Sequence, residues 1–159
     1  MMGAMISSNS YTASTGHNLF DAALESAASA GHLFISAAGN EGSDFNSGAT
    51  LEYPCCVSAS NNLCIASTDE SDALSSFSNH GDDYVHIAAP GSSILSTYHT
   101  SLVATQSGTS MATPLVAGAA ALVYSAFGYL TALEIKDLLL DSTESLSALE
   151  GGVTSHGLL

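Results

Sequence analysis

Basic residues are almost absent from this chain. Its 159 residues include fifteen Asp and Glu but one basic residue, Lys136, for a formal net charge of −14. Proteins bind nucleic acid largely by neutralising phosphates with Lys and Arg, so this balance argues against a nucleic acid partner. It argues equally against adhesion to an anionic membrane. The acidity suits a well-solvated extracellular protein, and adaptation to salt water is the alternative.

Cysteine is also scarce, since the chain has three: Cys55, Cys56 and Cys64. An odd, low count does not describe a disulfide-rich scaffold. Either Cys55 or Cys56 could pair with Cys64 if the intervening segment turns back, and buried free thiols are the alternative. No Cys or His pair has the spacing of a zinc site, so the sequence predicts no metal centre.

Charge is missing altogether between Asp83 and Glu134, so a membrane-spanning helix over residues 111–130 has to be considered. This window is dominated by small residues and has no flanking Lys or Arg, which favours a buried helix of a layered fold. We therefore predict no membrane span. Residues 1–10 have no basic region and no sustained apolar core, so they predict no signal peptide.

Helical and strand-like patterns alternate along the chain. Residues 18–30 place apolar side chains on one helical face and stop at Gly31, and residues 32–37 form an apolar run typical of a buried parallel strand. With a short strand at residues 5–10, this is the order of a βαβ unit. Further strands are expected at residues 63–67, 84–88, 94–97 and 102–106, and helices at residues 110–126 and 131–140.

Local signals support the two later helices. Pro114 is expected in the first turn of the helix at 110–126, where a missing N–H is tolerated. Thr131 and Glu134 have the spacing of a capping box. No repeat or low-complexity linker interrupts the chain, so we predict one domain.

Two polar residues stand where chemistry is expected. Ser110 lies at the start of the predicted helix at 110–126, where unpaired N–H groups and partial positive charge gather. Asn40 follows the strand at 32–37, at the edge of a parallel sheet where ligands bind, and its amide can donate to a developing oxyanion. Taken singly, Asn40 is more simply a turn residue and Ser110 a helix cap.

Taken together, these residues belong to motifs that resemble those of the subtilisin-like serine proteases, the subtilases. The motifs occur in the family's order at residues 37–42 (Ala-Ala-Gly-Asn-Glu-Gly), 77–81 (Phe-Ser-Asn-His-Gly), 88–91 (Ala-Ala-Pro-Gly) and 108–118, and the tail at 130–159 is similar too. The resemblance implies an α/β fold of three layers, α/β/α, with a mainly parallel sheet. The fold would be incomplete, because residues 1–159 correspond to the C-terminal portion of a single peptidase domain.

The resemblance also implies a chemistry. Ser110 would be the nucleophile of a serine endopeptidase that works through an acyl-enzyme, and Asn40 with the Ser110 N–H would form the oxyanion hole. Polypeptides would be the substrates, and family habit suggests an extracellular location. The residues that would bind substrate are Ser10 and Tyr11, in the substrate-pairing strand, and Ala37, Ala38 and Gly39, in the wall of a roomy apolar specificity pocket. At Thr12 the family usually has Gly.

The general base is what the chain lacks. The family's Asp motif and His-Gly-Thr motif both precede the segment that begins here, and neither occurs in this sequence. We therefore expect the chain alone to be inactive, because serine is a weak nucleophile without a base. The alternative is a truncated or diverged domain with a binding or assembly role. The six His are interpreted as structural or surface residues: His17, His32, His80, His86, His99 and His156.

No cofactor is implied for catalysis. His86 stands where many subtilases have an Asp that helps to bind calcium near the Tyr-Pro loop, here Tyr53-Pro54. The resemblance therefore does not extend to that calcium site. Other calcium sites of the family use residues of the missing half, so structural calcium is expected only in a longer protein.

Overall fold

A six-stranded sheet forms the centre of the computed structural model, which describes residues 3–15, 17–99 and 102–159. The strand order is β1-β2-β3-β4-β8-β7. The first five strands in this order, β1-β2-β3-β4-β8, each pair in parallel with their neighbours. The last strand, β7, pairs antiparallel with β8. The strands are β1 Ile6–Asn9, β2 Leu33–Ala37, β3 Asn62–Thr68, β4 Ile87–Pro90, β7 Glu144–Ser145 and β8 Gly157–Leu158.

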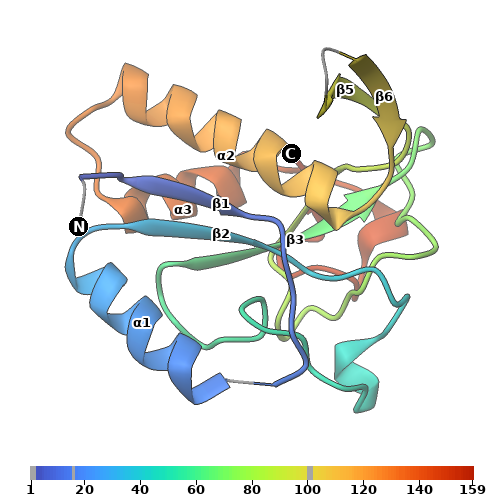
Figure 1. Cartoon of the computed structure of the whole chain (residues 1–159), viewed down its shortest axis with the longest axis horizontal. Coiled ribbons are helices and arrows are strands. Elements are labelled where there is room, and N and C mark those ends of the chain that lie inside the picture. Colours follow the sequence, from blue (N-terminus) through green and yellow to red (C-terminus); the bar gives the residue numbers. More distant parts are fainter. Residues whose placement is uncertain (1–2, 16, 100–101) are drawn as a thin grey trace.

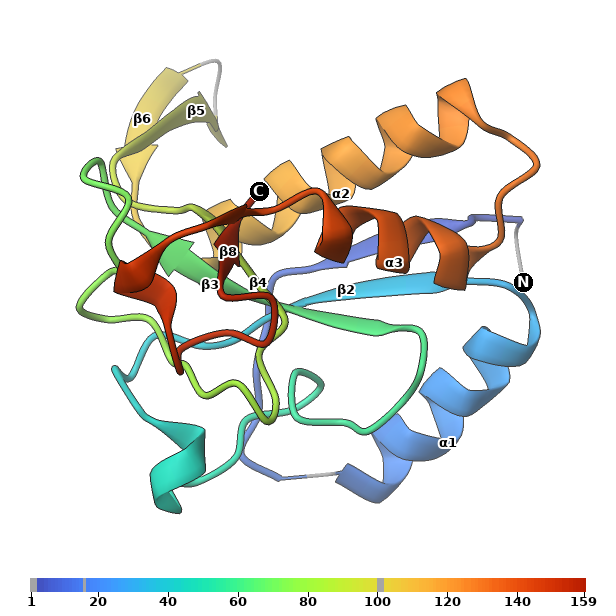
Figure 2. The ribbon, with the colours of Figure 1, turned by 180° about the vertical axis from the view of Figure 1, so that it is seen from behind.

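Helices cover both faces of this sheet. The helices α2 (Thr109–Ala126) and α3 (Ala132–Asp141) lie on one face, and α1 (His17–Ser29) lies on the other (Figure 1). The view from behind shows α3 below α2 on the same side of the sheet (Figure 2). This arrangement confirms the three-layer α/β/α fold with a mainly parallel sheet. A separate antiparallel hairpin, β5 (Ile94–Tyr98) and β6 (Leu102–Gln106), lies beyond the N-terminal end of α2 (Figure 1).

Hydrophobic clusters form on both faces of the sheet because successive strand residues face opposite sides. In β3, Leu63 and Ile65 face α2 and α3, while Cys64 and Ala66 face the other side. The first core is completed by small and branched side chains of the helices, which let α2 lie close to the sheet. These are Ala112, Val116 and Ala120 of α2 and Ala132, Ile135 and Leu139 of α3.

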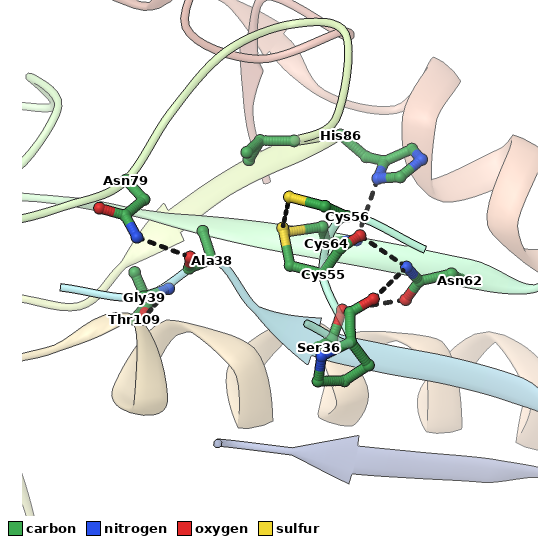
Figure 3. Close-up of a disulfide and its surroundings, with 12 residues drawn as sticks. Ser36, Ala38, Gly39, Cys55, Cys56, Asn62, Cys64, Asn79, His86 and Thr109 are labelled. Atoms are coloured by element: carbon green, nitrogen blue, oxygen red, sulfur yellow. Dashed lines mark hydrogen bonds between the residues drawn. A yellow bond between two sulfur atoms is a disulfide. The ribbon is translucent and has the colours of Figure 1, made fainter. Parts of the chain in front are cut away.

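The loop before β3 is fixed by a disulfide and a buried amide. Cys55 is bonded to Cys64, and Cys56 is free and buried. The Asn62 amide donates to the carbonyls of Pro54, Cys55 and Val57 and accepts from the Ser36 hydroxyl at 2.9 Å (Figure 3). The Asn62 side chain therefore supplies hydrogen-bond donors for three carbonyls of the turn at residues 54–57, which belongs to no strand.

Most expected elements are confirmed. The strands at 5–10, 32–37, 63–67, 94–97 and 102–106 and all three helices are present within a few residues of their expected bounds. The expected capping box is formed, since the Thr131 hydroxyl accepts from the Glu134 N–H and the Glu134 carboxylate accepts from the Thr131 N–H. By length and apolar composition α2 qualifies as a membrane span, but it lies on the sheet as a core helix, and the described residues show no clear span.

Two expectations are wrong. The strand predicted at 84–88 begins only at Ile87, because the N–H groups of Tyr84 and Val85 both bond to the Gly81 carbonyl in a turn. Pro114 is not in the first turn of its helix: α2 begins at Thr109, so Pro114 is its sixth residue. Sequence patterns also did not reveal β7 and β8, which are two residues each.

His86 lies partly buried beside β3 as a neutral imidazole. Its Nδ1 accepts the Cys64 N–H at 3.0 Å, so that nitrogen carries no proton (Figure 3). Burial, helped by the nearby Lys136 ammonium, lowers the pKa of His86 from 6.5 to about 3. An unfolded chain therefore takes up a proton at His86 at a higher pH than the folded chain does.

This difference predicts a loss of stability in acid. From about pH 6.5 down to about pH 3, protonation of the unfolded state lowers the free energy of unfolding, and above pH 6.5 the effect is absent. His86→Asn keeps an acceptor for Cys64 but does not titrate. The variant's urea unfolding curves should therefore fall less steeply with pH, by up to about 1.4 kcal/mol per pH unit. Parallel pH profiles for the two proteins would contradict this account of His86.

Candidate active site

Ser110 is the second residue of α2, at the carboxyl ends of the parallel strands. At this position the backbone N–H has no acceptor within the helix and projects outward from the N-terminal end. Gly108, just before the helix, has φ 155° and ψ 159°, which only glycine adopts without strain. A Cβ there would lie 3.5 Å from Asn40 Oδ1, an ordinary van der Waals contact. The backbone conformation, and not a lack of space, therefore requires glycine at the start of α2.

The Asn40 amide has one orientation. Its Oδ1 accepts the Thr109 N–H at 2.8 Å and the Thr109 hydroxyl at 3.2 Å. A backbone N–H can only donate, so the oxygen of the amide must face Thr109. The same hydroxyl accepts the Gly39 N–H at 3.1 Å. Asn40 is exposed, and the hydrogen bonds of the described residues include none from its Nδ2, which would lie 3.7 Å from a Cβ at Gly108.

Ser10 contacts Ser110 because of Pro114. A proline has no N–H, so the Ser110 carbonyl loses its usual partner four residues along the helix. The Ser10 hydroxyl donates to this carbonyl at 3.0 Å. In return, the Ser110 hydroxyl donates to the Ser10 carbonyl at 3.4 Å, a long and weak bond. Pro114 therefore leaves the Ser110 carbonyl free to accept from Ser10, which directly follows β1.

Asn79 holds the loop that carries Asn40, and sequence reasoning missed it. Its Oδ1 accepts the N–H groups of Glu41 and Ser43 at 3.1 and 2.9 Å. Its Nδ2 donates to the Ala38 carbonyl at 3.0 Å (Figure 3) and to the Glu41 carboxylate at 2.7 Å. Asn79 is fully buried, so these bonds fix the loop from inside the protein. The motif at 77–81 was the signal that could have identified it.

The other residues predicted to bind substrate lie around this loop. Ala37 ends β2, and Ala38 and Gly39 are buried immediately after it. A side chain at Gly39 would overlap the Asn79 amide, so only glycine fits there. Ser10 and Tyr11 follow β1, and Tyr11 is half exposed. The structure thus brings the predicted residues to one edge of the sheet, and their roles stay predictions.

Three histidines have partners elsewhere in the structure. His32 bonds the Ser7 hydroxyl and the Ala4 carbonyl, His80 lies 3.3 Å from the Ser78 carbonyl, and His86 bonds Cys64. His17 lies at the start of α1, and its side chain is outside the described structure. That no histidine of this chain acts as the base stays a prediction.

That the loop at Tyr53-Pro54 holds no calcium ion stays a prediction, and two contacts support it. His86 stands at this loop with a nitrogen that is already engaged by Cys64. The Lys136 ammonium donates to the Ser60 carbonyl at 3.1 Å and to the Asn62 carbonyl at 2.7 Å, which places a positive charge among the loop carbonyls. Calcium needs several free oxygen ligands. Within the described ranges, no three His, Cys, Asp or Glu side chains gather as a metal site.

Comparisons with known proteins agree with this geometry. The model of the Subtilase family matches residues 1–156. Thermitase from Thermoactinomyces vulgaris is 44% identical over 123 residues, which are 77% of this chain and 41% of thermitase. Subtilisin BL from Lederbergia lenta is 37% identical over 126 residues, 79% of this chain and 44% of that protein. The chain belongs to the subtilase family, a family of serine peptidases.

A solved structure supports the same assignment. A chain from a structure of the subtilase cytotoxin SubAB assembly superposes with a TM-score of 0.84 at 25% identity, over 98% of this chain and 55% of that one. The fold is therefore that of subtilases. This chain spans less than half the length of thermitase and of subtilisin BL.

Loss of the Asn79 amide should release the loop that carries Asn40. In Asn79→Ala, the N–H groups of Glu41 and Ser43 lose the acceptor of two part-buried hydrogen bonds, which costs about 1 kcal/mol per bond. Hydrogen exchange at these two amides should accelerate, and the urea midpoint should fall. Asn18→Ala, on the exposed face of α1, is the control and should change neither. Unchanged exchange at both amides would show that Asn79 does not hold the loop.

Proposed function

We propose that this chain is the C-terminal part of a subtilase catalytic domain and supplies the nucleophile and the oxyanion hole of a serine endopeptidase. Ser110 attacks the scissile peptide carbonyl and forms an acyl-enzyme, which water then hydrolyses. The observation that carries the proposal is the Asn40 amide. Thr109, the neighbour of Ser110 in the chain, binds the amide oxygen at 2.8 Å, so the amide N–H groups are not used in that contact and can donate to an oxyanion.

The oxyanion hole would have two donors on rigid supports. Asn40 Nδ2 is one and the Ser110 backbone N–H is the other, and the N-terminal end of α2 adds partial positive charge. Such donors act without reorganising during the reaction. Removing the corresponding asparagine from a subtilisin lowers kcat by about 10²–10³-fold, and a similar loss is expected for Asn40→Ala.

The base and its orienting acid would come from polypeptide outside these residues. An apolar groove next to Ser110 supports this. It lies between α2 and the hairpin and is lined by Met111, Pro114, Leu115 and Ile94. Further large apolar side chains are exposed on the hairpin, at Leu95, Leu102 and Val103, and on α2, at Leu122. The chain spans less than half of its curated relatives, and we infer that the remaining part of the domain covers this face.

Location and cofactors follow from the same proposal. An extracellular site of action fits the net charge of −14 and relatives such as the halolysin-like extracellular serine protease Nep from Natrialba magadii. The substrates are polypeptides. Catalysis by Ser110 needs no cofactor, and any structural calcium would bind residues of the longer domain.

A diverged domain with a binding or assembly role is the second candidate. The absent Asp and His-Gly-Thr motifs favour it. The intact Ser110, Thr109 and Asn40 arrangement counts against it, since a domain that has lost catalysis has no need of an oriented amide. An open reading frame upstream of Met1 that encodes both motifs would support the peptidase, and a genuine start codon with nothing upstream would support the binding domain.

Fluorophosphonate labelling tests the nucleophile. A protein that carries this chain together with the upstream Asp and His should label at Ser110, and Ser110→Ala should abolish the label. The 159-residue chain alone should label far more slowly, because it has no base. Mass spectrometry of the labelled peptide identifies the site. Strong labelling of the isolated chain that is lost in Ser110→Ala would refute the claim that the chain lacks a base. Failure of the longer protein to label at Ser110 would refute the assignment of Ser110 as the nucleophile.

A further inference from the structure

Three cysteines lie together where the loop before β3 meets the strand. Cys55 and Cys64 are bonded to each other, and Cys56 beside them is a free thiol. The Sγ atom of Cys56 lies 3.9 Å from Sγ of Cys55 (Figure 3). All three side chains are buried, with exposed fractions of 8% or less. A free thiol is thus in contact with a disulfide away from bulk solvent.

The backbone around Cys56 holds this contact in place. The Asn62 amide binds three carbonyls of the turn at residues 54–57. The Cys56 N–H donates to the Glu52 carbonyl at 2.9 Å. The thiol is therefore kept against the disulfide by a hydrogen-bonded turn, and both belong to one buried cluster of side chains.

A thiol beside a disulfide can exchange with it without an added oxidant or reductant. The Cys56 thiolate attacks Cys55 Sγ, the Cys55–Cys56 bond forms, and the Cys55–Cys64 bond breaks. Cys64 leaves as a thiolate and takes up the proton that Cys56 lost. Cys55 Sγ is the attacked atom because it is the sulfur that Cys56 contacts.

We propose that Cys56 is an exchange thiol that moves the disulfide from Cys55–Cys64 to Cys55–Cys56 in the folded protein and thereby unties the loop from β3. The Cα atoms of the native pair are 4.9 Å apart, within the usual range for disulfides. Adjacent residues have Cα atoms about 3.8 Å apart, below that range, so the exchanged form is the minor species. The exchange involves no residue of the candidate active site and does not depend on the proposed peptidase function.

The surroundings of Cys56 make the exchange slow near neutral pH. Burial raises the pKa of Cys56 to about 11; the backbone hydrogen bond with Glu52 opposes this effect, and the Glu52 charge adds to it. Only the thiolate attacks, so the exchange should accelerate as the pH rises toward 11. The other titratable side chains near the thiol are Tyr53 in its own loop and, along the cavity that Cys56 lines, Asp83, Tyr84 and His86.

Mapping of the free thiol tests the exchange. The folded protein is incubated at a series of pH values, quenched in acid and labelled with N-ethylmaleimide in acidic urea before mass spectrometry. At neutral pH the label should lie on Cys56. Above about pH 8 it should also appear on Cys64, at a rate that rises about tenfold per pH unit. A label that stays on Cys56 at every pH would overturn the proposal.

Two variants and a matched control test the role of Cys56. Cys56→Ser should show no label at any pH, and a Cys64 label in this variant would mean that the disulfide opens by another route. Glu52→Gln removes a charge that opposes the thiolate, so it should speed the exchange at a fixed pH by about twofold or more. Glu150→Gln, at an exposed position in the C-terminal loop, should leave the rate unchanged.

The position of the new label shows whether the folded structure directs the attack. In the urea-unfolded chain every pairing is accessible, so the label should spread over both Cys55 and Cys64. In the folded protein the label should be about tenfold or more higher on Cys64 than on Cys55, because Cys55 Sγ is the atom in contact. Equal labelling of Cys55 and Cys64 in the folded protein would contradict the proposed attack on Cys55.

Discussion

The contact between the end of β2 and the start of α2 is the constraint on which the site depends. Thr109 bonds with its N–H and its hydroxyl to Asn40 and accepts the Gly39 N–H. These bonds satisfy backbone groups that a helix N-terminus and a strand end would otherwise leave unpaired. They also orient the Asn40 amide and place Ser110 at the edge of the sheet. One set of contacts therefore closes the fold and prepares the proposed oxyanion hole.

The remaining polar contacts of the interior support this junction from both sides. Asn79 holds the loop beyond β2, and Asn62 holds the loop before β3. Both are buried amides that bond to several backbone groups at once, so losing either would leave more than one group unsatisfied. Pro114 adds a third link, because it frees the Ser110 carbonyl to accept from Ser10. These hydrogen bonds tie the loops around the site to one another and to the sheet.

The sequence predicted the helices and strands of the three layers better than it predicted the contacts between side chains. Apolar periodicity identified α1, α2, β2 and β3, because burial against a sheet imposes regular spacing on the side chains. It misplaced the start of β4. Tyr84 and Val85 have side chains that pack in the core, but their backbone forms a turn and not a strand. It could not decide between Cys55 and Cys56 as the partner of Cys64, because adjacent cysteines differ only in the direction of their side chains.

The sequence predicted which residues form the site but not the contacts that hold them in position. Ser110 and Asn40 could be found from their motifs, whereas the roles of Thr109 and Asn79 needed three-dimensional partners.

Chemical rescue of the missing base tests the central claim most directly. If the isolated chain already holds Ser110 and Asn40 in place and lacks only a base, added imidazole should accelerate fluorophosphonate labelling of Ser110. The acceleration should increase with the concentration of neutral imidazole and should be largely lost in Asn40→Ala. Labelling of Ser110 that does not respond to imidazole, or that responds equally at exposed serines elsewhere, would contradict a preformed nucleophile and oxyanion hole.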